Sequence, residues 1–320
     1  MKRVKILALV MALVLSLGIF LGCQKQEPVK ETTETPVETK VEDVKEDGEF
    51  TVTDMMGREI VFSKTPTKVI ALRPSDAEIL NAIGGIETLI GRGTYVDYPE
   101  SVLDLPVVAT GRDMNAEEII ALEPDLVLMS DMAQTEEQIE SIQSAGINVV
   151  ITSAATIEEV YKSIDLVGEV MGLKDNSQEL ISQMKSEFEE LAKTAEQNAG
   201  KKIYFEISPL EYGLWTGGNG TFMDEIGSLL GLENIFSDVD GWSEVSEEEV
   251  IARNPDFIVT IAMGSTEGET PVDEILGRTG WEGINAVQNK KVLNLTDDSL
   301  SRPSPRLIEG AKALSEFVSE

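Results

Sequence analysis

The chain has 320 residues, enough for about two domains, and combines 26 lysines and arginines with 58 aspartates and glutamates and no histidine. A formal net charge of -32 argues against nucleic acid as a partner, because neutralising phosphates requires basic patches. Without histidine, no Ser-His-Asp or Cys-His catalytic arrangement can form, and zinc sites that use imidazole are excluded. Acid–base chemistry that uses carboxylates alone is still compatible with this composition.

The N-terminus is typical of a processing signal. Residues 1–5, MKRVK, are basic, and the apolar run ILALVMALVLSLGIFLG directly precedes Cys23, the single cysteine of the chain. Because the small residue Gly22 precedes that cysteine, and because FLGC resembles a bacterial lipobox, we predict a signal peptide over 1–22 and lipid attachment at Cys23. The alternative is an uncleaved membrane anchor. A single cysteine also means that no intramolecular disulfide can form.

Residues 23–50 have the composition of a tether. They are rich in Glu, Thr, Lys and Pro, and none of residues 23–49 is aromatic. Such a stretch cannot bury enough apolar surface to offset the entropy lost on ordering. We predict a disordered segment that holds a folded body off the membrane, with that body beginning near Phe50.

Short apolar runs alternate with helical patterns along the rest of the chain. The runs at 68–72, 125–129, 147–152, 202–207, 256–262 and 291–295 are typical of buried parallel strands. Helices are expected between them, for example over 77–84 and 117–123. Strands that alternate with helices predict an α/β fold with parallel sheets, here in two lobes, 51–173 and 200–320.

A helical pattern joins the two lobes over residues 174–199. Leu180, Met184, Phe188 and Leu191 recur on one helix face, and no proline or glycine interrupts the stretch before Gly200. One long helix would make a stiff joint that permits little closure of the lobes. We expect a ligand cleft between the lobes, since small molecules often bind at domain interfaces.

One cassette occurs twice, as MNAEEIIALEPDLVL at 114–128 and as VSEEEVIARNPDFIV at 245–259. Most aligned pairs are identical or chemically similar. Asn115 and Ser246 are natural helix N-caps, and a glutamate three residues after each, Glu118 and Glu249, predicts a capping box in both copies.

Glu117 and Glu248 have matching positions in the two copies and are not needed for capping. A glutamate in the first turn favours a helix by about 0.3–1 kcal/mol through the helix dipole, which is one explanation of the pair. The other is that they form two prongs for a partner with two basic sockets.

With this repeat, the chain from about residue 51 resembles the solute-binding lipoproteins of bacterial ABC importers of the cobalamin and iron-siderophore type. The segments that match in order are TDMMGREIVF (53–62), TPTKVIALRPSDAEIL (65–80), both cassettes, TFMDEIGSLLGLENIF (221–236) and SRPSPRLIEGAKAL (301–314). The resemblance implies two Rossmann-like lobes joined by a backbone helix. It also implies a metal chelate in the cleft, and docking of Glu117 and Glu248 into arginine pockets of a membrane permease–ATPase.

The same resemblance predicts where the protein works and with what. We expect a monomer at the bacterial cell surface, lipid-anchored to the outer face of the cytoplasmic membrane. Its partners would be the permease–ATPase complex and a small metal chelate, without nucleic acid. No catalytic residue, protein metal site or resident cofactor is expected.

Aromatic residues favour cobalamin as the chelate, because a corrin ring presents a large and mostly apolar face. GTYVDYPE (93–100) resembles the first cleft loop of cobalamin binders and nominates Tyr95. DGWSEVS resembles their segment before the second docking helix and nominates Trp242, which we place in a loop, with core packing as the alternative. Trp215 in YGLWTGGNGT is a third candidate. At Gly111-Arg112 and Ser299-Leu300 the chain lacks aromatics that some cobalamin binders have.

Three arginines favour a different chelate. Arg73, Arg112 and Arg302 occupy strand-end or loop positions, where cleft residues are expected, and could clamp an anionic group. A ferric siderophore, or haem, is therefore the alternative ligand. The other explanation of these arginines is pairing with local carboxylates. Arg306 and Trp281 are predicted to be structural.

Two other classes of protein are alternatives to an importer component. A surface hydrolase with two carboxylates would need an acid and a base that flank one bond, and no pair is singled out. A tethered adhesin or signalling domain would have a macromolecular partner.

TGGNGT (216–221) lacks the ending of a phosphate-binding P-loop and is predicted to be a turn before a helix over 222–230.

Overall fold

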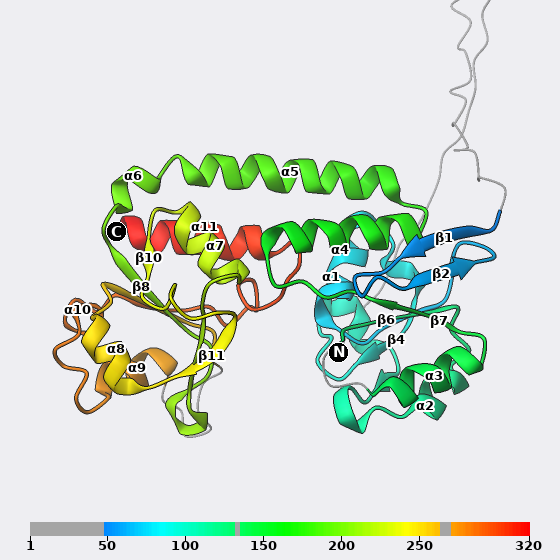
Figure 1. Ribbon diagram of the computed structural model, residues 1–320, viewed down its shortest axis with the longest axis horizontal. Helices are drawn as coiled ribbons and strands as arrows, with labels where there is room; N and C mark the ends of the chain where they lie inside the picture. Colours follow the sequence, from blue (N-terminus) through cyan, green and yellow to red (C-terminus); the bar gives the residue numbers. More distant parts are fainter. Residues whose placement is uncertain (1–47, 132–134, 263–269) are drawn as a thin grey trace, which may run out of the picture. The chain divides into compact units, whose positions relative to one another are not determined.

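The structure is a computed structural model that describes residues 48–131, 135–262 and 270–320 (Figure 1). The predicted signal peptide, Cys23 and nearly all of the predicted tether lie outside the described residues. All the described residues belong to one compact unit of the chain.

Two parallel sheets form the centre of the two lobes. The N-terminal sheet has the order β5-β4-β3-β6-β7, and the C-terminal sheet has the order β10-β8-β12-β13. The strands are β3 (Val69–Ala71), β4 (Leu89–Gly93), β5 (Val107–Val108), β6 (Leu126–Met129), β7 (Asn148–Ile151), β8 (Lys202–Glu206), β10 (Glu233–Asn234), β12 (Phe257–Thr260) and β13 (Val292–Asn294). All six predicted strands are confirmed. The sequence missed β4, β5 and β10, which are short or only half buried.

Alternation along the strands gives each sheet two buried faces. In β8, Ile203 and Phe205 join one apolar cluster, whereas Tyr204 between them joins another. The helices that cover the sheets are α1 (Pro74–Ile83), α2 (Ala116–Ala121), α3 (Glu136–Ser144), α4 (Ile157–Val170), α7 (Phe222–Leu229), α8 (Glu247–Arg253), α9 (Pro271–Gly277), α10 (Asn285–Gln288) and α11 (Leu307–Ser319). Short 3-10 turns lie at Ile86–Thr88, Glu100–Asp104, Gly111–Asp113 and Leu210–Tyr212.

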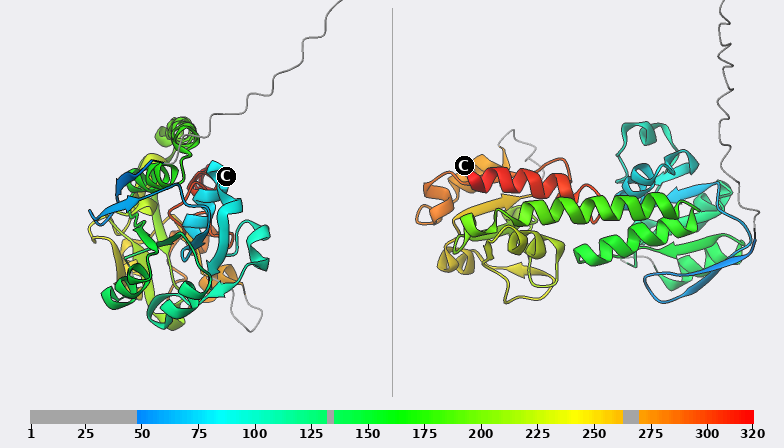
Figure 2. Two further views of the ribbon diagram at one scale, coloured as in Figure 1. Left: turned by 90° about the vertical axis from the view of Figure 1, so that its right-hand side faces the viewer. Right: turned by 90° about the horizontal axis from the view of Figure 1, so that it is seen from above.

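Helix α5 (Lys174–Ala192) connects the lobes, but it is shorter than predicted. A separate helix, α6 (Ala195–Asn198), follows it, so the prediction of one helix over 174–199 is wrong at its C-terminal end. The break occurs where Thr194 turns its hydroxyl back to the Leu191 carbonyl at 2.8 Å, a local bond that competes with the helical pattern. The helix packs against α1 and α4 of the first lobe and against α7 and α11 of the second (Figures 1 and 2).

The buried face of α5 belongs to a core that both lobes share. Ile181, Met184 and Phe188 are buried in an apolar cluster that includes Val69 of the N-terminal sheet and Phe205 of the C-terminal sheet. Because this cluster continues from one sheet to the other through α5, the connection is a packed joint rather than a linker.

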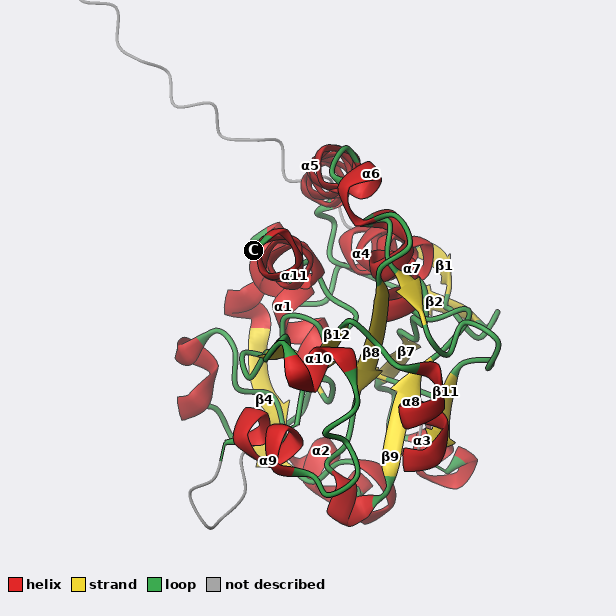
Figure 3. Cartoon of the chain, turned by 90° about the vertical axis from the view of Figure 1, so that its left-hand side faces the viewer, coloured by secondary structure: helices red, strands yellow, loops and turns green. Residues whose placement is uncertain are grey.

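Two antiparallel ribbons complete the described structure. Strands β1 (Phe50–Thr53) and β2 (Glu59–Phe62) form the first, where the rings of Phe50 and Phe62 stack at 5.1 Å. Phe50 is the first residue of the first described strand. Strands β9 (Leu214–Gly217) and β11 (Trp242–Val245) form the second, which leads into α8 (Figure 3).

The repeated cassette has the same backbone in both lobes. Helix α2 is followed by Glu123 with φ 50°, and helix α8 is followed by Asn254 with φ 49°. Each of these left-handed residues precedes a proline and a central strand of its sheet. The sequence repeat therefore encodes a repeated helix, turn and strand.

Candidate functional site

The two cassette helices begin with the expected caps but use them differently. In α8 the Ser246 hydroxyl accepts from the Glu249 N–H at 3.2 Å, and the Glu249 carboxylate accepts from the Ser246 N–H at 3.1 Å, which is the predicted capping box. In α2 the Asn115 side chain accepts from the Glu117 N–H at 3.0 Å. Glu118 accepts from the Asn115 side-chain amide at 3.3 Å, so the predicted capping box at α2 is wrong.

Glu117 and Glu248 occupy equivalent places in the first turns of α2 and α8. Both side chains are exposed. Neither carboxylate has a hydrogen bond or ion pair with any other residue in the ranges that the structure describes. The pair is therefore available to a partner, one glutamate from each lobe.

Trp215 and Trp242 share one face of the β9–β11 ribbon. Trp242 is paired with Gly217, and Trp215 lies two residues before that glycine, so both side chains project to the same side. Each is 40% exposed. Trp242 begins a strand, which corrects the prediction that it lies in a loop.

The indole of Trp242 is held by its neighbours. Its ring meets that of Phe222, the first residue of α7, edge to face with centroids 5.2 Å apart. A Cβ atom at Gly217 would approach Cζ3 of Trp242 to 3.0 Å, so the glycine makes room for the indole. Sequence reasoning missed Phe222 as the support of Trp242, because the two are distant in sequence.

Tyr95 lies in the segment that follows β4 and is 70% exposed. This segment turns closely against the sheet, since a Cβ at Gly93 would lie only 2.3 Å from the Leu72 carbonyl oxygen. Val96 is fully buried and anchors the turn, so the neighbouring Tyr95 projects into solvent.

The three nominated arginines have different surroundings. Arg73 is half-buried at the N-cap of α1, and its guanidinium donates to the Thr152 carbonyl. Arg112 is exposed, and no carboxylate in the described ranges pairs with its side chain. Arg302 is only 12% exposed and forms three ion pairs. Its surroundings match the other explanation of these arginines, namely pairing with carboxylates.

Arg302 belongs to an ionic cluster around Glu78 of α1. Its guanidinium lies 3.0 Å from Glu78, 2.7 Å from Asp97 and 2.5 Å from Asp298. Arg306 lies 3.5 Å from the same Glu78, and its guanidinium carbon is 4.5 Å from the centre of the Tyr98 ring. Burial raises the pKa of Glu78, while Ser304 and the arginines lower it. The cluster joins α1 of one lobe to the loop before α11 of the other.

Asp76 is a buried carboxyl group at the same edge of the N-terminal sheet as Arg73. One of its oxygens accepts from the Thr152 hydroxyl at 2.6 Å, and the other has no hydrogen-bond partner among the described residues. Burial raises the pKa of Asp76 to about 6, against the opposing effects of Arg73 and Thr152.

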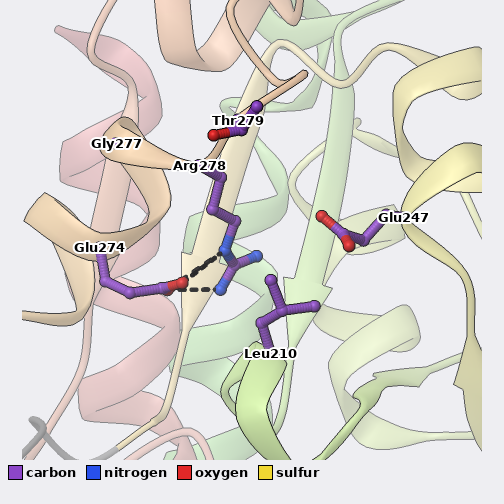
Figure 4. A pocket seen from close by; sticks show the side chains of 6 residues that line it. All are labelled: Leu210, Glu247, Glu274, Gly277, Arg278 and Thr279. Carbon is purple, nitrogen blue, oxygen red and sulfur yellow. Dashed lines mark hydrogen bonds and ion pairs between the residues drawn. The ribbon is translucent and has the colours of Figure 1, made fainter.

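A recess of about 400 Å³ lies beside the first turn of α8 (Figure 4). Its lining residues are Leu210, Glu247, Glu274, Gly277, Arg278 and Thr279. Figure 4 shows Glu247 facing the Arg278 guanidinium from the other side of the recess. Arg278 is itself almost fully buried and paired with Glu206 and Glu274.

Neither a metal site nor a membrane span occurs in the part of the chain that the structure describes. No group of three or more Cys, Asp or Glu side chains there could hold a metal ion. No described helix is both long and apolar enough to cross a membrane. Trp281, predicted to be core, is fully buried. The turn predicted at 216–221 is wrong at its start, because Thr216 and Gly217 belong to strand β9, whereas 218–221 turn into α7.

The two α/β lobes and the connecting helix are the architecture of a bilobal solute-binding protein. The periplasmic binding protein family matches residues 69–299, and the chain belongs to this family, whose members are the solute-binding components of ABC importers. The relatives of this chain are solute-binding proteins rather than enzymes, and they work outside the cytoplasm.

Three similar proteins show how far the likeness extends. The ABC transporter substrate-binding lipoprotein YvrC of Bacillus subtilis is 34% identical over 84% of this chain and 85% of its own length. The vitamin B12-binding protein of Salmonella typhimurium is 29% identical over 79% of this chain and 90% of its own. The structure of a possible iron-binding (periplasmic solute-binding) protein from Staphylococcus epidermidis has a TM-score of 0.65 at 29% identity, covering 80% of this chain and 100% of that one.

Proposed function

We propose that this protein captures a corrinoid such as cobalamin between its lobes and delivers it to a membrane permease–ATPase. The observation that supports this ligand is the pair Trp215 and Trp242 on one face of the β9–β11 ribbon, half-exposed and backed by Phe222. Exposed aromatic surface of this kind suits a large, mostly apolar ring. Tyr95 offers a further exposed aromatic from the other lobe. The likeness to a vitamin B12-binding protein agrees with this choice.

A ferric siderophore or haem is the second candidate ligand. It is favoured by Arg112, which is exposed and has no carboxylate partner among the described residues, and by the likeness to a possible iron-binding protein. Arg73 could also bind an anionic group of the ligand if its guanidinium released the Thr152 carbonyl. Arg302 is the weakest of the three, because binding an anion would require it to leave three carboxylates.

The ligand is tested by isothermal titration calorimetry on residues 50–320 with cyanocobalamin, haem and a panel of ferric siderophores. The expected result is tight one-to-one binding of cyanocobalamin alone, and weaker binding by Trp242→Ala. Binding of a ferric siderophore or haem instead would overturn the corrinoid and leave the importer role in place. Unchanged affinity of Trp242→Ala would remove this residue from the site.

Delivery is proposed to use Glu117 and Glu248. Each is an exposed, unpaired carboxylate at the same place in its lobe, which matches a partner that presents two basic sockets. The double variant Glu117→Ala with Glu248→Ala should bind its chelate with unchanged affinity and fail to support uptake in cells. If the double variant loses chelate binding, the docking assignment is wrong.

The mature protein is proposed to be a monomer, held at the cell surface by a lipid on Cys23. The likeness to a lipoprotein of Bacillus subtilis and the sequence around Cys23 support the lipid anchor. Mass spectrometry of the membrane-extracted protein should show a chain that begins at Cys23 with a diacylglyceryl modification. Replacing Cys23 by Ser should abolish the modification, and a lipid-modified Cys23→Ser chain would contradict the assignment.

A further inference from the structure

Glu247, the residue before the proposed docking glutamate Glu248, is hydrogen-bonded to a buried tryptophan. Glu247 is the first residue of α8, and its carboxylate accepts a hydrogen bond from the indole N–H of Trp281 at 2.9 Å. An indole N–H can only donate, and a buried one usually has an acceptor. Glu247 provides the acceptor here, so this bond ties the first turn of α8 to the core.

Trp281 is itself held firmly. Its side chain is fully buried, and the guanidinium carbon of Arg278 lies 4.4 Å from the centre of its ring. Arg278 binds the buried carboxylate of Glu206 at 2.6 and 2.8 Å, with Glu206 at the end of strand β8. A continuous set of contacts therefore runs from the central strand of the sheet to the first residue of α8.

A helix of this length needs such support. Helix α8 spans Glu247–Arg253, and isolated helices this short are unstable in water, so its stability must come from tertiary contacts. Glu248 has no partner of its own among the described residues, and the start of α8 therefore determines where its carboxylate lies. An error of about 1 Å in the start of the helix would move that carboxylate by a similar distance.

We propose that Trp281 and Glu247 are positioning residues, which hold the first turn of α8 so that Glu248 meets its socket on the permease. This inference rests on the proposed docking function. The bond has no counterpart in the other lobe, because Ala116 is the first residue of α2. Helix α2 is instead held by Gln138 of α3, whose side-chain amide donates to the Met114 carbonyl at 2.8 Å.

This difference between the lobes makes the test specific. Trp281→Phe keeps the buried ring and removes the indole donor, and it should disturb Glu248 without affecting Glu117. The assay is the ATPase activity of the permease from the source organism in proteoliposomes. It is titrated with full-length binding protein that is loaded with cyanocobalamin, or with the ferric chelate that calorimetry selects.

The expected result is a rise of about five- to tenfold in the half-saturating concentration of Trp281→Phe, as for a lost side-chain hydrogen bond, with chelate affinity within about twofold of wild type. In a Glu248→Ala background, Trp281→Phe should have no further effect, whereas in a Glu117→Ala background its full effect should remain. Glu247→Gln, which keeps a side-chain acceptor, should be closer to wild type than Glu247→Ala.

The outcomes separate this inference from the docking proposal. A defect of Glu248→Ala without any defect of Trp281→Phe or Glu247→Ala would overturn the inference alone. So would a defect of Trp281→Phe that persists in the Glu248→Ala background, since it would then act by another route. A wild-type half-saturating concentration for Glu248→Ala would overturn the docking assignment itself, and the inference with it.

Discussion

Asp76 shows at the residue scale how a buried charge opposes folding. The carboxyl group is fully buried, one of its oxygens is unpaired among the described residues, and its pKa is raised to about 6. The unfolded chain would release this proton near the ordinary aspartate pKa of about 3.9. The folded protein therefore binds the proton more tightly, and the group destabilises the fold increasingly as the pH rises from about 4 to about 6.

Asp76→Asn should remove this pH dependence, because the amide cannot ionise while its oxygen can still accept from Thr152. The measurement is the free energy of unfolding in urea, for the variant and the wild type, at several pH values. The difference, variant minus wild type, should grow by about 2–3 kcal/mol between pH 4 and pH 7, the equivalent of a shift of about two pKa units. A difference that stays constant over this range would contradict the assignment.

The β9–β11 ribbon shows at the element scale why a glycine is required. A Cβ at Gly217 would lie 3.0 Å from Trp242, 3.1 Å from the Thr221 hydroxyl and 3.2 Å from Cβ of Met223. Three side chains, one from β11 and two from the start of α7, would have to give way. The position of the Trp242 indole therefore depends on the absence of a side chain at Gly217.

Gly217→Ala should lower the free energy of unfolding by about 1–3 kcal/mol through overpacking, and should change the tryptophan fluorescence as Trp242 is displaced. Gly283→Ala is the matched control, because no atom lies within 4 Å of its added Cβ. Chemical denaturation and emission spectra check both variants. Equal stability and equal spectra for the two variants would show that Trp242 does not depend on Gly217.

At the scale of the whole molecule, the lobes are joined by non-covalent contacts as well as by the continuous chain. The apolar cluster runs through α5 from one sheet to the other, and the Phe222 N–H of α7 donates to the Ala155 carbonyl at 2.6 Å. The ionic cluster adds Glu78 of α1 to Arg302 and Arg306 of the C-terminal segment. These contacts predict a stiff pair of lobes, in agreement with the expectation from the connecting helix.

Glu78→Ala should cost about 3 kcal/mol, because the side chain is only 1% exposed and its removal leaves two partly buried arginines with fewer partners. Glu309→Ala removes an exposed partner of Arg306 and should change stability by at most about 0.5 kcal/mol. Urea denaturation at neutral pH compares the two. A cost for Glu78→Ala no larger than that for Glu309→Ala would show that the cluster does not stabilise the contact between the lobes.

Much of the fold could be predicted because its signals are local. The strands are continuous apolar runs, and the caps at Asn115 and Ser246 depend on residues within one helical turn. Predictions failed where another choice was equally local. At the end of α5 the Thr194 hydroxyl donates to the Leu191 carbonyl, and at α2 Glu118 accepts from the Asn115 side chain rather than from its backbone. The predicted lipid anchor, the lobe boundaries and the roles of the nominated site residues stay predictions.

The sequence by itself determined the α/β class, the repeated cassette and the two equivalent glutamates, because periodicity and capping are properties of neighbouring residues. Only the tertiary structure decided that Arg302 is surrounded by carboxylates, that Phe222 supports Trp242, and that Trp281 reaches Glu247. Each of these contacts joins residues that are far apart along the chain. Their meeting depends on how the sheets, helices and ribbons pack, which no local pattern specifies.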